Sequence, residues 1–99
     1  MAIEEAPPNI LLISYDLIGK ERPGAYEAVI GMIEAEAISS VRALYSQWLV
    51  ETDEAPAEWS AHLEAVIDEN DTYLIVPVTV LPDGYLASKV IAWLKERLP

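Results

Sequence analysis

The chain has 99 residues, 53% of them hydrophobic, which is typical of one folded domain and excludes a disordered segment. Its 17 acidic and 6 basic residues give a net charge of −11, the wrong sign for a general nucleic-acid-binding protein, because such proteins neutralise phosphates with Lys and Arg. The absence of cysteine excludes disulfides, thiolate metal sites and cysteine nucleophiles, and it fits a reducing, cytoplasmic location.

The N-terminal residues predict neither export nor membrane insertion. Residues 1–8 are acidic and end in two prolines, whereas a signal peptide begins with basic residues. No apolar run approaches the ~20 residues that span a bilayer. We therefore expect a cytoplasmic protein with no membrane partner. It forms one domain, 1–99, in which residues 1–8 are a flexible tail.

The first half of the chain predicts a strand, a helix and a hairpin. Residues 9–17 are an almost unbroken apolar run, typical of a central strand covered on both faces. The turn residues of 18–24 predict a loop. Apolar residues recur with a period of 3.6 over 25–38, which predicts a helix. Residues 41–50 predict two short strands with a reversal near 45–47, and one long bent strand fits the same pattern.

The second half predicts two helices around a fourth strand. Pro56 is preorganised for the first turn of a helix. The apolar stripe of that helix consists of Trp59, Leu63, Val66 and Ile67. Residues 72–80 predict a strand that lies at an edge or bends at Pro77, because proline has no N–H to donate. The periodicity of 86–98 predicts a last helix with basic residues near its C-terminus.

The order of these elements predicts an α+β fold, a ferredoxin-like βαββαβ sandwich with an additional C-terminal helix. In this arrangement the helices cover one face of a four-stranded sheet. The strands at 9–17 and 72–80 are apolar at both odd and even positions, so the second face is also apolar. Because one short chain has nothing left to cover that face, we expect a homodimer that packs sheet to sheet.

Four segments of the chain carry a resemblance to a known family. They are Leu12-Ile13-Ser14-Tyr15-Asp16-Leu17, residues 46–53 (SQWLVETD), Ala61-His62-Leu63 and residues 67–71 (IDEND). In their order and spacing the chain resembles the small CRISPR-associated adaptation proteins that accompany the integrase, and it resembles their SinR-like relatives more closely. The resemblance covers about residues 9–79. It implies a ferredoxin-like fold and a dimer formed through the sheets.

Asp16 is the one candidate catalytic and metal-binding residue. In the adaptation proteins that the chain resembles, the aspartate closing the first strand is proposed to bind a divalent metal for phosphodiester cleavage. Magnesium often takes only one or two carboxylates plus water and phosphate oxygens, so one Asp16 from each subunit could suffice at a dimer axis. The alternative is that Asp16 caps the following loop by accepting backbone N–H groups. Those proteins also hold DNA with basic surfaces, whereas carboxylates dominate this chain.

Other residues with chemical potential are expected to be structural. His62, the only histidine, is predicted to face the polar side of its helix without a partner, as an inert surface residue. Residues 19–24 (GKERPG) lack the glycine spacing and the Lys-Ser/Thr ending of a phosphate loop. Trp48 and Trp59 are predicted to lie in the core, and Trp93, off the main stripe, at an interface. No pattern predicts a bound organic cofactor.

An acidic stretch runs from Glu51 to Asp71 with no Lys or Arg. It is either a solvated face or a surface that meets a basic protein partner. We therefore expect a non-catalytic, homodimeric interaction protein whose acidic surface meets a protein partner. The alternative is a metal-dependent endonuclease that uses paired Asp16 carboxylates and magnesium. The charge favours the first hypothesis, and the aspartate at the end of the strand favours the second.

Overall fold

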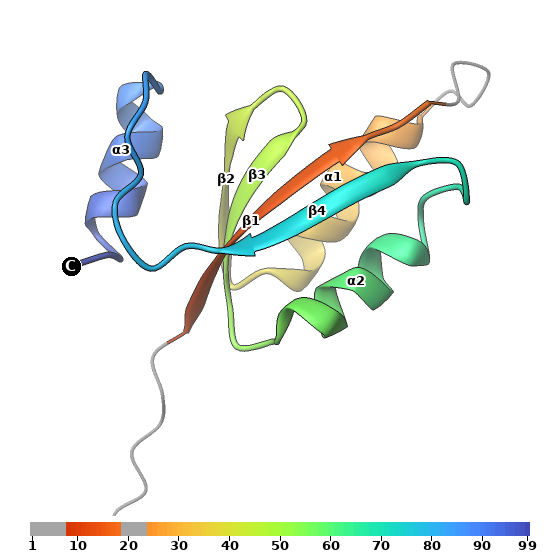
Figure 1. Ribbon diagram of the computed structural model, residues 1–99, viewed down its shortest axis with the longest axis horizontal. Coiled ribbons are helices and arrows are strands. Elements are labelled where there is room, and N and C mark those ends of the chain that lie inside the picture. Colours follow the sequence, from red (N-terminus) through yellow and green to blue (C-terminus); the bar gives the residue numbers. More distant parts are fainter. Residues whose placement is uncertain (1–7, 19–23) are drawn as a thin grey trace, which may run out of the picture.

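A four-stranded antiparallel sheet forms the frame of the computed structural model, which describes residues 8–18 and 24–99 (Figure 1). The elements are β1 (Asn9–Asp16), α1 (Ala25–Glu36), β2 (Ser39–Leu44), β3 (Gln47–Thr52), α2 (Pro56–Glu64), β4 (Thr72–Pro77) and α3 (Ser88–Lys95). The chain is therefore an α+β protein with three helices in its described part, as the sequence predicts. Among those helices, none is long and apolar enough to cross a membrane.

The strands lie in the order β2-β3-β1-β4, and every neighbouring pair is antiparallel. β1 is central, because it pairs with β3 on one side and with β4 on the other. Ser14, for example, pairs with Gln47 of β3 and with Leu74 of β4. β4 is an edge strand and ends at Pro77, which confirms the prediction for this proline, although the strand is shorter than the predicted 72–80.

A hairpin joins β2 to β3, which decides between the two interpretations of this segment. The chain reverses at Tyr45 and Ser46, where the sequence predicts the turn. Arg42 helps to close it, since its Nε donates a hydrogen bond to the Tyr45 carbonyl oxygen at 2.9 Å. The strand pairing shifts register between Arg42 and Leu44, so a bulge precedes the turn.

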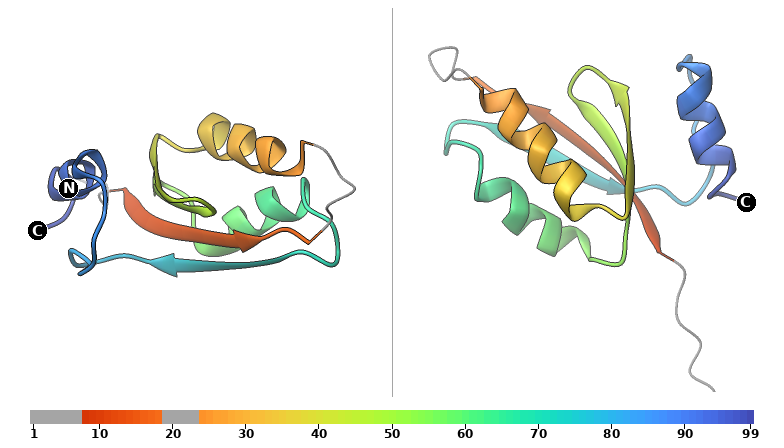
Figure 2. Two further views of the ribbon diagram at one scale, coloured as in Figure 1. Left: turned by 90° about the horizontal axis from the view of Figure 1, so that it is seen from above. Right: turned by 180° about the vertical axis from the view of Figure 1, so that it is seen from behind.

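The larger core lies between the sheet and the pair α1 and α2, which Figure 2 shows on the same side of the sheet. Side chains alternate along a strand, so the odd-numbered residues of β1 and the even-numbered residues of β3 face these helices. The fully or nearly buried members are Leu11, Ile13, Tyr15, Val29, Ile33, Trp48, Val50, Trp59 and Leu63. The predicted core positions of Trp48 and Trp59 are therefore confirmed.

Local signals set the starts of both helices. Gly24 precedes α1 with φ 81°, a left-handed conformation that glycine adopts readily. Pro56 occupies the first turn of α2, as predicted. α2 ends at Glu64, and the predicted stripe residues Val66 and Ile67 pack against the core from the segment that follows.

The second face of the sheet is not wholly open, which corrects the expectation that nothing in the chain covers it. α3 packs on this face near β2, apart from the other helices (Figure 2). Its Val90, Trp93 and Leu94 form a smaller core with Ile10 and Leu49. The physical reason is that α3 has an apolar stripe of its own, and the even-numbered side of β1 offers the surface to bury it.

Polar contacts fix α3 in place. Trp93 Nε1 donates a hydrogen bond to Ser39 Oγ at 2.9 Å, and the Arg97 guanidinium lies 4.2 Å from the centre of the Trp93 ring. Arg97 Nε also donates to Glu51 Oε1 at 3.1 Å. Trp93 thus packs within its own chain, where the sequence predicts an interface. The predicted tail 1–8 lies outside the described residues except for Pro8.

Candidate functional site

Asp16, the residue that the sequence singles out, is the exposed last residue of β1. It lines a surface hollow of about 330 Å³ together with Ser14, Tyr15, Ser46, Thr72, Tyr73 and Leu74. None of the described residues that line this hollow is Lys or Arg. Among the described part of the chain, Asp16 belongs to no group of three residues that could hold a metal ion.

The chain beyond β1 is held by Asp71. Its Oδ1 accepts a hydrogen bond from the Ile18 N–H at 2.8 Å, and its Oδ2 accepts one from the Asp68 N–H at 2.8 Å. Asp71 is 8% exposed, so these bonds lie in a largely buried setting. The sequence offers Asp16 as a cap for the loop after β1. At Ile18, however, the acceptor is Asp71, which lies in the turn before β4.

Tyr15 and Trp48 are the buried side chains that lack polar partners. The Tyr15 hydroxyl and the Trp48 Nε1 are both buried, and neither has a hydrogen-bond partner among the described residues. Burial raises the pKa of the Tyr15 hydroxyl because it disfavours the charged phenolate, and the nearby Arg42 charge and Trp48 N–H oppose this rise without cancelling it. Tyr15 is thus a packing residue that stays protonated.

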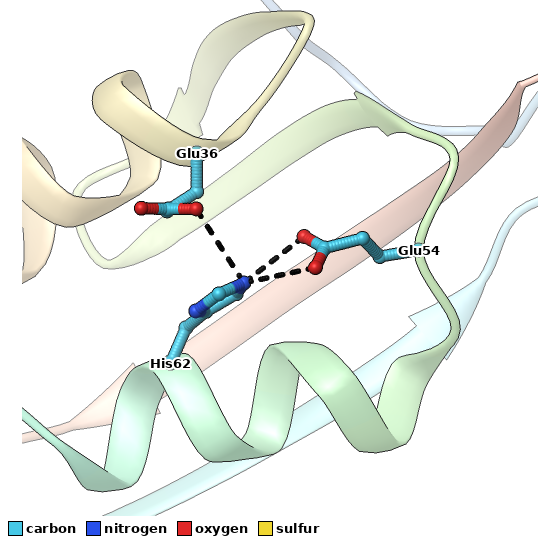
Figure 3. A group of neighbouring side chains, drawn as sticks. All are labelled: Glu36, Glu54 and His62. Atoms are coloured by element: carbon cyan, nitrogen blue, oxygen red, sulfur yellow. Dashed lines mark hydrogen bonds and ion pairs between the residues drawn. The ribbon is translucent and has the colours of Figure 1, made fainter.

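A second cluster joins His62 of α2 to two glutamates (Figure 3). His62 Nε2 lies 3.0 and 3.2 Å from the two carboxylate oxygens of Glu54, and 3.6 Å from Oε2 of Glu36. Figure 3 shows both carboxylates pointing at the same ring nitrogen. The prediction that His62 has no partner is therefore wrong: it faces the end of α1 and the β3–α2 loop.

Two members of this cluster, Glu54 and His62, are positioned by contacts with buried residues. Glu36 is the last residue of α1. The Glu54 N–H donates a hydrogen bond to Thr52 Oγ1 at 3.0 Å. The His62 ring packs edge-on against Trp59, with 5.4 Å between ring centres and 80° between planes. The ring and the loop that carry two of the three groups are thus anchored to buried residues.

One imidazole nitrogen and two carboxylates are ligand types that divalent transition metals accept. They are also groups that form an ion pair when the histidine is protonated. The sequence shows no motif for them, because Glu36, Glu54 and His62 lie on three separate elements with no characteristic spacing. The only signal in the sequence is the presence of one histidine in a chain rich in glutamate.

An apolar groove of about 280 Å³ lies on the second face of the sheet, beside α3. Its lining includes Leu12, Leu44, Leu49, Val78, Tyr85 and Leu86. Leu74 and Val76 of β4 continue this surface, because they pair with Ser14 and Leu12 and point to the same side. Leu74 is 61% exposed and Leu44 is 51% exposed, so much of this face is uncovered within one chain.

The acidic stretch lies on the other side of the molecule. Its exposed members on α2 and in the adjoining loops are Asp53, Glu58, Glu64, Asp68 and Glu69. α2 covers the sheet face opposite the apolar groove. One molecule therefore presents an apolar surface and an acidic surface on opposite sides.

The chain was compared with protein-family models, with curated proteins and with solved structures, and no significant match was found. The described residues offer three features that bear on function. They are the hollow at Asp16, the cluster around His62 and the apolar face beside α3.

Proposed function

We propose that the protein is a non-catalytic, homodimeric interaction protein with a ferredoxin-like fold, related to the SinR-like branch of the CRISPR-associated adaptation proteins. The element order and the antiparallel sheet β2-β3-β1-β4, with α1 and α2 on one face, are compatible with the split βαβ arrangement. α3 is then the additional C-terminal helix. The proposal rests above all on the exposed apolar face of the sheet.

This face has the character of a protein contact surface. We call Leu12, Leu44, Leu74, Val76 and Tyr85 the apolar sheet patch. Leu74 and Val76 of β4 and Leu44 of β2 are exposed side chains on the two edge strands of the sheet, and Tyr85 is fully exposed. Exposed apolar residues that cluster in this way mark interaction sites more often than scattered ones do.

A second copy of the chain is the occupant that fits best. The chain has a net charge of −11, so two copies repel each other wherever their acidic surfaces meet. The residues of the apolar sheet patch carry no charge, which makes it a surface on which two acidic copies can approach. A two-fold contact uses the same patch on both subunits and needs only self-complementarity, which an apolar face provides.

The acidic helix surface stays outward in such a dimer. α2 lies on the sheet face away from the patch, so both copies would present Glu58, Glu64 and Glu69 to solvent. Two acidic surfaces on one dimer favour a partner with a basic surface, by charge complementarity. The proposed cytoplasmic partner is thus a basic protein surface rather than a nucleic acid, whose phosphates these carboxylates would repel.

The oligomeric state tests this proposal. We expect light scattering after size-exclusion chromatography to give a mass of twice 11.0 kDa for the wild-type chain. Leu74→Lys places a charge on the most exposed strand residue of the patch and should give monomers. Ala35→Lys adds the same charge on the exposed face of α1 and should leave the dimer intact. A wild-type chain that remains monomeric at high micromolar concentration contradicts the proposal.

One observation favours the alternative, a magnesium-dependent endonuclease. Asp16 lies on the same sheet face as Leu12 and Ser14, since side chains alternate along β1. A dimer formed through that face would bring its two Asp16 carboxylates toward the interface. Hydroxyl groups of Ser14, Ser46 and Thr72 line the same hollow and could orient water or phosphate oxygens.

A nuclease assay separates the two functions. The purified dimer is incubated with single- and double-stranded DNA and RNA in magnesium, next to Asp16→Asn and the exposed-residue control Asp53→Asn on the acidic side. Cleavage by the wild type and by Asp53→Asn, but not by Asp16→Asn, would establish the nuclease. A dimer that cleaves nothing supports the interaction protein, for which the hollow at Asp16 contributes no chemistry.

A further inference from the structure

We propose that Glu36, Glu54 and His62 form a binding site for a divalent transition metal ion, with zinc as the best fit. The site lies where the end of α1, the β3–α2 loop and α2 meet (Figure 3). It belongs to the α1/α2 layer of the molecule, on the side away from the apolar sheet patch. The inference is therefore independent of the dimer and of Asp16.

The distances between the three groups suit one shared ion. His62 Nε2 lies 3.0 Å from Glu54 Oε1 and 3.6 Å from Glu36 Oε2, and one ligand atom from each residue lies within 4.8 Å of the others. Ligands at 2.0–2.2 Å from a tetrahedral zinc ion are roughly 3.3 Å apart. A zinc ion can thus bind between these atoms after small side-chain rotations.

Charge provides a second argument. Two carboxylates converge on one nitrogen, and within the described residues neither Glu36 nor Glu54 forms an ion pair with Lys or Arg. A neutral imidazole can donate only one hydrogen bond from Nε2, and the 3.6 Å distance to Glu36 is too long for one. A cation between the carboxylates would satisfy both of them and the ring nitrogen together.

Contacts within the chain hold two of the three ligand side chains. The side chains of His62 and Glu54 are only 26% and 32% exposed. Thr52 Oγ1 holds the Glu54 backbone, and the buried Trp59 ring orients the imidazole. Glu36, at 45%, is the most exposed of the three. Ligands that are ordered in advance lose little conformational entropy on binding.

The ligand set selects the class of metal. Imidazole suits zinc and the other first-row transition metals, whereas magnesium and calcium prefer oxygen ligands alone. Zinc binds histidine and carboxylate readily, and three protein ligands leave its fourth position for water or for a group from a partner. We therefore expect zinc to bind and magnesium to compete poorly.

Calorimetric titration of the full metal-free chain with zinc chloride tests the site. We expect saturation at one zinc per chain. Glu36→Gln, Glu54→Gln and His62→Gln should each weaken binding by roughly 100-fold or more, since even the loss of outer partners of a ligand costs 10–100-fold. Glu34→Gln is the matched control, because it removes an exposed charge from the same helix and should bind zinc like the wild type.

Thermal unfolding provides a second readout. A ligand at 100 times its Kd should raise the Tm of a domain of this size by roughly 10 °C or more. We expect this rise for the wild type and for Glu34→Gln, and not for Glu36→Gln. Glu36 is exposed at a helix end, so its variant stays folded and decides the matter even if His62→Gln unfolds.

Two outcomes overturn the proposal. One is the absence of saturable zinc binding by the wild type, which would leave the cluster as a histidine hydrogen-bonded to Glu54 beside a second carboxylate. The other is zinc binding that is equal in Glu36→Gln, Glu54→Gln and the control, which would assign the ion to scattered surface carboxylates. The proposal is supported if zinc binding is lost in the cluster variants and kept in Glu34→Gln.

Discussion

Trp59 donates a hydrogen bond from its indole Nε1 to the hydroxyl Oγ1 of Thr52 at 2.9 Å, and both side chains are fully buried. Thr52 ends β3, and Trp59 lies on the inner face of α2. The same hydroxyl oxygen accepts the Glu54 N–H. This one side chain therefore joins the sheet, the helix and the loop that carries Glu54.

We expect Thr52→Val to lower the free energy of unfolding by about 1–3 kcal/mol, because valine has the same shape but leaves the buried Trp59 N–H without an acceptor. Thr52→Ser keeps the hydroxyl and should lose less. Urea unfolding followed by tryptophan fluorescence measures both variants. Equal stabilities for Thr52→Val and the wild type would show that the hydrogen bond contributes nothing.

Asp71→Ala should lower the free energy of unfolding by about 2–4 kcal/mol, because it removes the acceptor for two backbone N–H groups from a largely buried site. The exposed Asp83→Ala, in the loop before α3, is the control and should change stability by less than about 0.5 kcal/mol. Chemical unfolding measures both. Similar effects of the two substitutions would contradict the role assigned to Asp71.

Tyr15→Phe should leave stability at neutral pH unchanged or raise it by about 1 kcal/mol. The substitution removes a buried hydroxyl that has no hydrogen-bond partner, and it keeps the ring that packs in the core. Tyr85→Phe removes a hydroxyl from a fully exposed ring and should have no effect. A clear loss of stability in Tyr15→Phe would mean that the hydroxyl has a partner.

The same substitution should make the protein more resistant to alkali. Burial raises the pKa of Tyr15, so above pH ~10 the unfolded chain loses this proton before the folded chain does. The free energy of unfolding contributed by Tyr15 is therefore constant below that pH and falls as the pH rises above it. Urea midpoints at pH 8 and pH 11 should differ less in Tyr15→Phe than in the wild type or in Tyr85→Phe.

Arg97→Lys should loosen α3. Arg97 donates hydrogen bonds to Glu51, to the Trp93 carbonyl and to Ser39, and it stacks on the Trp93 ring, a geometry that a lysine ammonium cannot reproduce. We expect the free energy of unfolding to fall by about 1 kcal/mol. Relative to the wild type, hydrogen exchange should become faster in α3 and stay the same in β1. Lys95→Arg, on the exposed side of the same helix, is the control. Unchanged exchange in α3 would contradict this docking role.

Much of the secondary structure could be predicted from the sequence, because its signals are local. The apolar run that became β1, the 3.6-residue period of α1 and the proline at the start of α2 each act within a few residues. The ends were less predictable. α1 stops at Glu36, because Ala37 is already extended and leads into β2, and β4 stops at Pro77, each a few residues before the apolar pattern ends.

One candidate site could be predicted from the sequence and the other could not. Asp16 was identifiable because it ends a strand, and the structure places it there, exposed. The partners of His62 were not identifiable, since Glu36 and Glu54 reach it only after α1 and α2 pack on one face of the sheet. The docking of α3 on the second face was equally hidden, because its apolar stripe matches either face.

The α+β class, the order of the elements, the central place of β1 and the acidic character of the surface could all be read from the amino-acid sequence. Each of these follows from composition or from periodicity along the chain. Three features emerge only from the folded arrangement: α3 covers the second face of the sheet, Asp71 accepts the Ile18 N–H after β1, and His62 lies beside two glutamates. The physical reason is that these contacts join residues far apart in the chain, and their geometry exists only once the helices have packed on the sheet.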